Sequence, residues 1–385
     1  MNILLVSRGY PTKQEPTWGC FEKDQAESLS QLGHKVTIIS VDIRFRWHWR
    51  KLGVTHQIID GVNVYNLFCI PYALLFFLPT HLKHKFYAFL YKRLCKKVIQ
   101  TEGIPDVIYA HYLNYMYYGI QLQKELNVPL VGIEHWSEMG KKEIQPSTLQ
   151  RAQQIYSQLD QLIVVSSALK QNILNNIPLQ TPIHIVNNMV GNEFRYTPVQ
   201  SHHPLTLVST GSLIQRKGYD LLIEALAQIP DLPQDWQLLI IGDGILKSKL
   251  EKTITDKGLQ QHIHLVGRKN KQQIADIFHN SDFFVLPSRS ETFGVVYIEA
   301  LACGLPVIAT NCGGPSDIVY PENGLIVPNE NIAALADAIQ YMATNLNKYN
   351  RQTIALNCLD NFSPTVIAKQ LTAIFQEATK TYKKQ

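Results

Sequence analysis

The chain has 385 residues, which is enough for two or three domains with separate hydrophobic cores. Hydrophobic residues make up 45% of it and charged residues 17%, which excludes a disordered or collagen-like chain. The net charge of +5 is mild. The six cysteines include no C-x-x-C pair, which argues against a zinc site or a disulfide framework and favours a reducing cytosol.

The beginning of the chain does not resemble a targeting segment. Its apolar run, 2–7, breaks at Arg8 and lacks both a basic leader and an apolar core long enough for a secretion signal. The most apolar stretch, 67–78, is interrupted by a proline and falls well short of the roughly 20 residues that span a bilayer. We therefore expect a cytoplasmic protein that begins at Met1 and has no transmembrane helix.

Apolar, β-branched runs alternate with amphipathic stretches along the first half of the chain. This alternation is typical of parallel sheets whose two faces are covered by helices. A polar segment bracketed by prolines, 195–204, interrupts the rhythm and predicts a linker. Before it, the sequence predicts strands at 2–7, 35–40, 106–111, 129–134, 161–167 and 183–188.

A second series of the same kind follows the linker. Two doubly wound, Rossmann-like α/β domains are the natural interpretation, and ligands of such sheets bind at the carboxyl ends of the strands. We expect an N-terminal domain over 1–195 and a C-terminal domain over 205–365, with a helical tail from Asn331. The second series predicts strands at 205–211, 237–244, 263–267, 283–288, 306–310 and 324–328.

The segment 288–310 contains two glutamates eight residues apart, Glu291 and Glu299, with Gly294 where a helical pattern begins. Free backbone N–H groups at such a helix start favour a bound anion. The carboxylate of Glu299 suits a pair of sugar hydroxyls, and Glu291 would face whatever lies beyond the phosphates. An acid that favours the helix dipole, together with an acid on the helix surface, explains the pattern equally well.

The segment 211–220 places Arg216 and Lys217 on the turn after a predicted strand, with Gly218 at the start of a helix. Two adjacent cations at the carboxyl end of a strand are well placed to neutralise a diphosphate. An ordinary solvated basic turn is the alternative, and it fits Arg216 better than it fits Lys217.

Several short motifs in the second half of the chain have to be considered together. Besides the two glutamates, they are GSLIQRKG (211–218), IIGDG (240–244), LVGR (265–268), GGPSDIV (313–319) and NGLIV (323–327). Their combination resembles the retaining glycosyltransferases of family 4, and the resemblance is strong from about Leu205 to Pro328. In the first half, 18–40 resembles that family's opening glycine loop, helix and strand.

The resemblance implies a GT-B architecture, in which two Rossmann-like domains face each other across a cleft and a final helix, 366–385, crosses back to the first domain. It implies that Glu291 contacts the transferred hexose, that Glu299 contacts the nucleotide ribose and that Lys217 binds phosphate. The residues expected to complete donor binding are Arg216, Phe293, Gly294 and Gly19.

The family also has a histidine at the end of an N-terminal strand, and His135 matches it best. This makes His135 a catalytic candidate beside Glu291 and Lys217, as a hydrogen-bond partner of the donor sugar or of the acceptor. A histidine packed beside Trp136 is the alternative interpretation. His111 ends the preceding predicted strand and is a second candidate in the same place.

The sequence departs from the family pattern at Ser212, which stands where a basic residue often follows the strand-end glycine, and Arg216 is the candidate replacement. The glycines of IIGDG do not form a dinucleotide fingerprint, because Lys247 replaces the third glycine, and NAD binding is not expected. Turns at 242–244 and 267–268 either pass close to the nucleotide or simply end their strands.

No D-x-D motif occurs, which argues against a diphosphate held by a metal ion, and we expect no metal and no cofactor. The charge on the leaving diphosphate would be met by Lys217, Arg216 and the helix start near Gly294. In the mechanism that this implies, the departing phosphate oxygen helps to deprotonate the acceptor hydroxyl. The new bond then forms on the same face of the sugar, with retention.

The region 43–100 is basic and aromatic, with ten Lys or Arg residues and one acid, Asp60. Within it, 80–99 has apolar residues at helical spacing with lysines around them, a pattern that an anionic membrane surface attracts. Packing of the apolar stripe on a sheet, with solvated lysines, is the alternative. Nucleic acid is not an expected partner, because no recognised binding motif accompanies the basic residues.

The sequence therefore predicts transfer of a hexose from a nucleoside-diphosphate sugar to a glycan or to a lipid-linked saccharide. By resemblance, a bacterial surface polysaccharide is the expected product, and the inner face of the cell membrane is a candidate location. Two alternatives remain open. One is a nucleotide-sugar epimerase or hydrolase, and the other is a non-catalytic protein that binds a sugar nucleotide.

Overall fold

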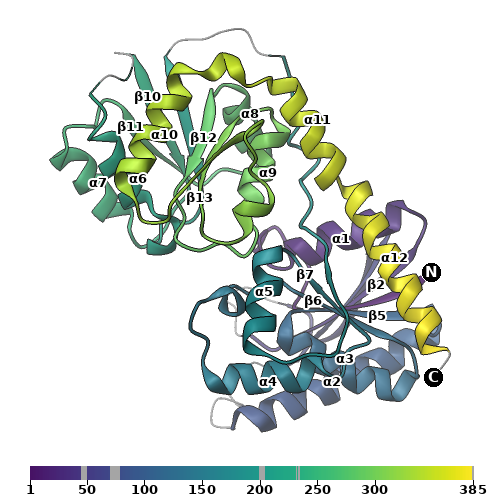
Figure 1. Ribbon diagram of the computed structural model, residues 1–385. Coiled ribbons are helices and arrows are strands. Elements are labelled where there is room, and N and C mark those ends of the chain that lie inside the picture. The colour runs from purple at the N-terminus through teal and green to yellow at the C-terminus, as the bar shows by residue number, and fades with distance from the viewer. Residues whose placement is uncertain (45–49, 70–78, 199–203, 231, 233–234, 384–385) are drawn as a thin grey trace. The chain divides into compact units, whose positions relative to one another are not determined.

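The computed structural model describes residues 1–44, 50–69, 79–198, 204–230, 232 and 235–383, and these divide into two compact units (Figure 1). Unit 1 consists of residues 1–165, 170–187 and 364–385. Unit 2 consists of residues 166–169 and 188–363. Residues 188–195, which follow the last strand of unit 1, therefore belong to unit 2. The expected linker at 195–204 lies partly outside the described residues.

Unit 1 is built on an eight-stranded sheet within the described residues, in the order β3-β4-β2-β1-β5-β6-β7-β8. All of its strands run parallel except the edge strand β3, which is antiparallel to β4. The expected neighbours at 106–111 and 129–134 do pair, as β5 and β6. The strands are β1 (Asn2–Ser7), β2 (Lys35–Asp42), β3 (Gly53–Ile59), β4 (Val62–Phe68), β5 (Val107–His111), β6 (Leu130–Glu134), β7 (Gln161–Val164) and β8 (Ile183–Ile185).

The β3–β4 hairpin is absent from the sequence prediction, although the chain contains a signal for it. Asp60 and Gly61 form the two-residue turn, and both have positive φ, 49° and 81°. Asp-Gly is a preferred pair for a turn of this type because it tolerates positive φ at both positions. The excess of basic and apolar residues around the hairpin hid this signal.

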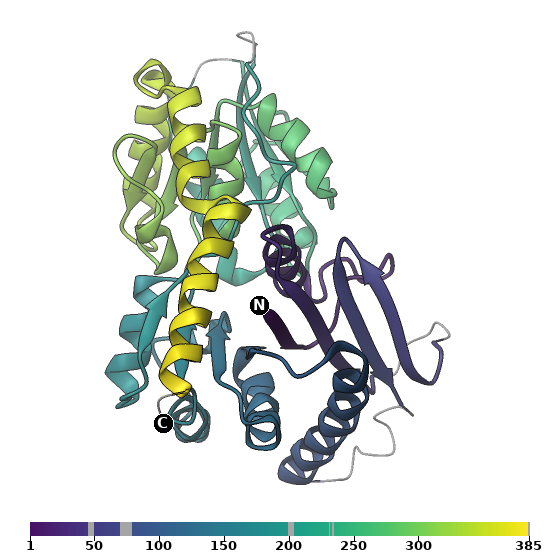
Figure 2. The same ribbon diagram turned by 90° about the vertical axis from the view of Figure 1, so that its right-hand side faces the viewer.

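The helices of unit 1 cover both faces of its sheet. The last of them, α12, comes from the C-terminal end of the described chain and packs against α1, β5 and β6 (Figure 2). Tyr109 on β5 meets Phe375 on α12 with ring centroids 4.9 Å apart. The helices are α1 (Cys20–Gln31), α2 (Thr80–Glu102), α3 (Tyr112–Leu126), α4 (Pro146–Tyr156), most of α5 (Ser167–Asn176) and α12 (Pro364–Tyr382), with the short 3-10 helix η2 (Ser137–Gly140).

Unit 2 has a six-stranded, entirely parallel sheet within the described residues, in the order β11-β10-β9-β12-β13-β14. Most of its strands end one to three residues earlier than the sequence predicted, because glycine, serine or proline follows the apolar run. The strands are β9 (Leu205–Thr210), β10 (Trp236–Ile241), β11 (Ile263–Gly267), β12 (Phe283–Leu286), β13 (Val307–Thr310) and β14 (Gly324–Val327).

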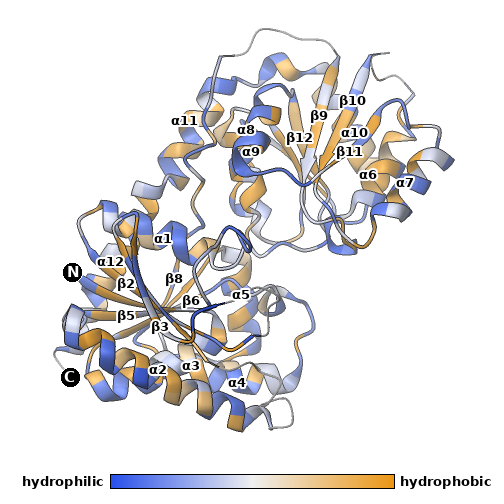
Figure 3. Cartoon of the chain, turned by 180° about the vertical axis from the view of Figure 1, so that it is seen from behind, coloured by the Kyte–Doolittle hydropathy of each residue, from blue (hydrophilic) through white to orange (hydrophobic). Residues whose placement is uncertain are grey.

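The strands of both sheets are mainly hydrophobic, whereas the helices present mixed surfaces (Figure 3). This is the pattern of parallel sheets buried between helical layers, and it confirms the expected architecture of two Rossmann-like α/β units. The helices of unit 2 are α6 (Tyr219–Leu226), α7 (Lys247–Asp256), α8 (Lys271–His279), α9 (Val295–Ala302), α10 (Ile332–Thr344) and α11 (Arg351–Phe362), with the 3-10 helices η3 (Gln215–Lys217), η4 (Gly314–Asp317) and η5 (Leu346–Lys348).

Each sheet has one point at which the direction of winding reverses. In unit 1 the reversal lies between β1 and β5, and in unit 2 it lies between β9 and β12. The loops after two such strands diverge to opposite faces of the sheet and leave a crevice at the carboxyl ends, where ligands of this architecture bind. The topology therefore marks one candidate position in each unit.

None of the helices in the described part of the chain combines enough length with enough apolar character to cross a bilayer. Most of the apolar stretch at 67–78 lies outside the described residues.

Candidate functional site

At the switch point of unit 2, three of the predicted site residues come together. η3 follows β9, and its Lys217 ammonium donates a hydrogen bond to Oε1 of Glu291, which follows β12. Ser288 Oγ donates to the same oxygen over 2.8 Å, and the Arg216 guanidinium lies 3.6 Å from Oε2. The Lys217 and Glu291 side chains are only 12% and 7% exposed. We call these four residues the Lys217 cluster.

Glycine at position 218 permits the close approach of the two loops. Gly218 has a φ of 68°, and a Cβ there would lie 2.0 Å from the carbonyl oxygen of Pro287. The turn after β9 can therefore press against the end of β12 only without a side chain. A backbone hydrogen bond of 2.7 Å, from the Arg289 N–H to the Arg216 carbonyl, joins the same two loops.

Arg289, which is not among the predicted site residues, also joins these loops through its side chain. Its guanidinium donates to both carboxylate oxygens of Asp220, at 2.9 and 2.8 Å, and to the Gln215 carbonyl at 2.7 Å. Its Nε donates to Glu330 at 2.9 Å. Burial disfavours the charged form of Asp220, but Arg289 outweighs this and lowers the pKa of Asp220. The fork geometry fixes the turn after β9 relative to the loop after β12.

A glycine pair supports the loop of Glu291 from its other side. Glu291 forms an isolated parallel bridge with Gly313, and the Gly314 N–H donates to the Glu291 carbonyl over 3.0 Å. The expected helix start is present, because α9 begins directly after Gly294, whose φ is 101°. Phe293 is 2% exposed and anchors the loop in the core of unit 2.

The other predicted donor-binding positions of unit 2 differ in their exposure. Glu299 is half-buried on α9, five residues and about 7.5 Å along the helix axis from Gly294. Ser212 is exposed at the end of β9, so the second cation near Glu291 is Arg216. Arg268 is 81% exposed and lies 3.7 Å from Asp243, as in a solvated turn.

At the switch point of unit 1, the two predicted histidines are neighbours. His111 ends β5 and His135 follows β6, and their ring nitrogens Nδ1 and Nε2 lie 3.3 Å apart. The two rings are stacked with centroids 5.3 Å apart, and the Phe21 ring is also stacked on His135 at 5.6 Å. Burial, followed by the nearby His135 and Arg8, holds the pKa of His111 well below its usual value. His111 is therefore uncharged at neutral pH.

Glu134 is a second residue that the sequence analysis missed. It is fully buried at the end of β6. Its carboxylate accepts hydrogen bonds from the N–H of His135 at 3.0 Å, the N–H of Trp136 at 2.8 Å and the hydroxyl of Tyr156 at 2.8 Å. Burial outweighs these bonds and raises the pKa of Glu134 to about 7. The available signal was an acid at the end of a continuous apolar strand, and the carboxylate fixes the backbone from which His135 projects.

The predicted Gly19 lies in the loop between β1 and α1. It precedes α1 with a φ of 79°, and a Cβ there would lie 2.3 Å from the carbonyl oxygen of Gly9. In the same loop, Arg8 pairs with the buried Glu22 at 3.0 Å and lies 4.7 Å above the ring of Tyr112. Glycine at position 19 thus lets the loop fold back tightly beside Arg8.

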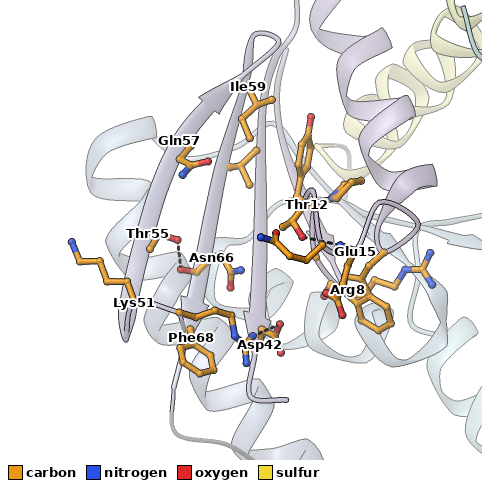
Figure 4. Close-up of a pocket in the computed structure, with 17 residues that line it drawn as sticks. Arg8, Thr12, Glu15, Asp42, Lys51, Thr55, Gln57, Ile59, Asn66 and Phe68 are labelled. Carbon is orange, nitrogen blue, oxygen red and sulfur yellow. Dashed lines mark hydrogen bonds and ion pairs between the residues drawn. The ribbon is translucent and has the colours of Figure 1, made fainter. Parts of the chain in front are cut away.

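A pocket of about 350 Å³ opens on unit 1 between this loop and the β3–β4 hairpin (Figure 4). Arg8 lines the pocket and also lies over the ring of Tyr112, which contacts the ring of His135. These side chains connect the pocket to the histidine pair. Asp42 also lines the pocket and accepts a hydrogen bond from Arg50 at 2.7 Å. Much of the remaining lining consists of neutral groups that can form hydrogen bonds, with apolar side chains beside them. These residues are Thr12, Thr55, Gln57, Asn66, Ile59 and Phe68. Such a mixed lining suits a small polar ligand.

Two family models match the chain in succession. Residues 23–194 match the model described as Glycosyltransferase Family 4, and residues 193–355 match Glycosyl transferases group 1. An uncharacterized glycosyltransferase of Methanocaldococcus jannaschii is 33% identical over 257 residues, which cover 66% of this chain and 69% of that protein. The putative teichuronic acid biosynthesis glycosyltransferase TuaC of Bacillus subtilis is 29% identical over 365 residues, 88% of each chain.

Solved structures share the whole fold. Sucrose-phosphate synthase from Thermosynechococcus elongatus has a TM-score of 0.77 at 21% identity, over 99% of this chain and 100% of that one. HepE of Anabaena, solved in complex with UDP, has a TM-score of 0.71 at 18% identity, over 98% and 100%. These likenesses confirm the GT-B fold that the sequence motifs implied.

Proposed function

This chain belongs to the glycosyltransferases of group 1 and family 4, and we propose that it transfers a hexose from a nucleoside-diphosphate sugar to a saccharide hydroxyl with retention. The main support is the Lys217 cluster, which places two cations and a carboxylate at the switch point of unit 2. The UDP complex of HepE supports a nucleotide donor for this fold.

In this proposal the donor diphosphate lies against Lys217 and Arg216. The two cations and Glu291 have a formal net charge of +1, which attracts the diphosphate while Glu291 keeps the ammonium in place. The backbone N–H groups at the start of α9 add a second favourable environment for negative charge. No step of the proposal requires a metal ion.

The two glutamates then bind the two sugars of the donor. Glu291, at the loop end nearest the cations, hydrogen-bonds hydroxyls of the transferred hexose. Glu299, farther along α9, takes the ribose diol with its two acceptor oxygens. A carboxylate on the hexose helps transfer more than it helps nucleotide binding, because it contacts only the part of the donor that moves.

In the transfer step, the bond between the anomeric carbon and the diphosphate oxygen breaks, and its electron pair stays on that oxygen. The oxygen accepts the proton of the acceptor hydroxyl, whose own oxygen forms the new bond on the same face. Lys217 and Arg216 stabilise the charge that develops on the leaving diphosphate. The result is a product with the anomeric configuration of the donor.

Unit 1 supplies the acceptor side of the reaction. The pocket of Figure 4 has the neutral hydrogen-bonding groups and adjoining apolar surface that a sugar ring requires, and Arg8 connects it to the histidine pair. We assign His135 to a hydroxyl of the donor sugar or of the acceptor, held in place by Glu134 and Phe21. The teichuronic acid name of the Bacillus relative supports a surface polysaccharide as the product.

Helix α2 supports docking to an anionic membrane, where a lipid-linked acceptor would be found. The predicted helix is present, but its apolar stripe is divided between two environments. Leu90, Leu94 and Val98 are buried on the sheet, whereas Phe89 is 56% exposed. The exposed apolar ring lies on the same helix as exposed lysines such as Lys85, which suits a membrane surface. Residues 45–49, the other aromatic and basic run, lie outside the described residues.

The test is a panel of UDP- and GDP-hexoses, incubated with and without saccharides linked to polyprenyl diphosphate. Nucleotide release is measured, and NMR gives the anomeric configuration of the product. We expect release that depends on the acceptor, a product of retained configuration and full activity in EDTA. Equal release without acceptor would indicate a hydrolase or an epimerase, and binding without release would indicate a sensor. An inverted product, or activity that EDTA abolishes and magnesium restores, would contradict the mechanism.

A further inference from the structure

The β3–β4 hairpin has different pockets on its two faces. Side chains alternate between the faces of a strand, so that Thr55 and Gln57 on β3 point into the polar pocket of Figure 4. Val54 on β3 and Leu67 on β4 line a second crevice, which lies between the hairpin and α2. This crevice has a volume of about 500 Å³.

The lining of the second crevice is mainly apolar. Its walls are formed by Leu52, Val54 and Leu67 of the hairpin region and by Leu90 and Leu94 of α2, and Phe68 also lines it. Leu52 is 54% exposed although it adjoins other apolar side chains. When a hydrocarbon chain covers the walls of such an open apolar crevice, the walls are removed from water and the free energy falls.

Two basic side chains complete the crevice. Arg93 and Lys97 lie four residues apart on α2, both are exposed, and both line the crevice. Like charges at this spacing repel each other along a helix. Neither forms an ion pair with any residue in the described part of the chain. The crevice thus joins an apolar interior to a pair of uncompensated positive charges.

We propose that this crevice binds a single anionic lipid, with the hydrocarbon chain against Val54, Leu67 and Leu94 and the phosphate at Arg93 and Lys97. Charge complementarity selects this occupant, because a neutral lipid would leave both cations without a partner and a free phosphate would leave the apolar walls exposed. The inference deepens the proposed function, since it names the lipid component that holds unit 1 at a membrane-linked acceptor.

Cys69 provides a reporter inside the crevice. It lines the cavity and is half-buried, and its thiol is not part of a disulfide. The probe is dodecyl phosphate below its micelle concentration, with inorganic phosphate and dodecyl maltoside as the two comparison arms. We expect dodecyl phosphate to slow alkylation of Cys69 by about tenfold, as saturable binding predicts. Neither comparison arm should protect Cys69.

Two variants distinguish binding in this crevice from general electrostatic attraction to a charged surface. Val54→Trp fills the crevice, and Arg93→Glu with Lys97→Glu reverses its charge. Each should weaken dodecyl phosphate binding, measured by calorimetry, by about tenfold or more. The matched control, Lys85→Glu with Lys96→Glu, changes the helix charge equally but lies outside the crevice lining, and should remain within about twofold of the original protein.

The proposal is overturned if Val54→Trp binds the probe as the original protein does, or if both double reversals weaken binding equally. Protection of Cys69 by inorganic phosphate alone would also overturn it, since the chain would then be unnecessary. Transfer to a water-soluble saccharide acceptor is measured in parallel on all variants. If Val54→Trp retains that transfer but no longer binds dodecyl phosphate, the lipid site and the glycosyltransferase proposal both stand. If the original protein catalyses transfer but dodecyl phosphate does not protect its Cys69, only the lipid site is rejected.

Discussion

Unit 1 and unit 2 both gather polar side chains where their strands end and the winding of the sheet reverses, yet the two sets differ in charge. In unit 2, charged groups of opposite sign meet at the Lys217 cluster and come from two short segments of the sequence. In unit 1, Glu134, His111 and His135 are buried, and burial disfavours the charged forms of Glu134 and His111. One switch point is suited to binding a diphosphate, and the other is suited to directing hydroxyl groups and protons.

The largest effect that this comparison predicts concerns Lys217. Lys217→Ala removes a cation from the leaving diphosphate and should lower kcat/KM for transfer by about 1,000-fold, with weaker binding of the donor. Steady-state kinetics and calorimetry with the nucleoside diphosphate measure the two effects. Lys257→Ala, which removes an exposed ion pair with Glu224 in the same unit, is the control and should change neither. Unchanged kinetics for Lys217→Ala would remove it from the phosphate site.

Glu291→Gln separates hexose recognition from diphosphate binding. The substitution keeps the shape of the side chain but raises the formal charge of the cluster from +1 to +2. Transfer should fall by about 100-fold, because the carboxylate on the hexose is lost. Binding of the free nucleoside diphosphate should stay the same or become tighter. A parallel loss of transfer and nucleotide binding would contradict the assignment of Glu291 to the sugar.

Arg289 tests whether the cluster depends on the fork that joins its two loops. Arg289→Ala should lower kcat by about tenfold, since small displacements of binding groups reduce rates strongly. Arg289→Lys keeps the charge but not the two parallel hydrogen bonds to Asp220, so it should restore only part of the loss. Asp220→Asn should have an effect that is not additive with Arg289→Ala. A purely structural role would lower the melting temperature without changing kcat at low temperature.

Glu134 gives the smallest expected effect on transfer and a clear effect of pH on stability. Burial raises its pKa from 4.5 to about 7, so the folded protein retains a proton that the unfolded chain releases between these values. The resulting stabilisation is complete below pH 4.5 and is lost as the pH rises through 7. Its upper limit is about 3 kcal/mol.

Urea unfolding at about pH 5 and about pH 8 measures this dependence. Glu134→Gln mimics the protonated side chain and should lose less stability between the two pH values than the original protein. Glu143→Gln, at an exposed position of the same unit, is the control and should behave as the original protein does. Equal losses in all three proteins would show that Glu134 does not set the dependence.

The fold and the proximity of Lys217 to Glu291 were predictable from the sequence, for a physical reason. Alternating apolar runs indicate buried parallel strands, and a cation or carboxylate that directly follows such a strand must lie at its carboxyl end. Lys217 and Glu291 both follow this rule, although 74 residues separate them. The position of His111 next to His135 follows from the same reasoning, because β5 and β6 are neighbours.

The residues that escaped prediction have partners that no local pattern reveals. Arg289 finds Asp220 only through the pairing of β9 with β12, and Glu134 finds Tyr156 only after α4 has packed on the sheet. The β3–β4 hairpin was missed for a different reason. Its Asp60-Gly61 turn lies in a region rich in lysine and arginine, and this basic composition obscures the alternation of side chains that marks the two strands.

The return of α12 to unit 1 has a consequence for biosynthesis. Strands β5 and β6 leave the ribosome early, but the helix that covers Tyr109 is encoded more than half a chain later. We therefore expect the first unit to complete its folding only after translation has passed Tyr382, in contrast to the usual order in which the leading domain folds first. Nascent chains that stop just before Pro364 should be held by chaperones or degraded, although they contain all of unit 2, which ends at residue 363.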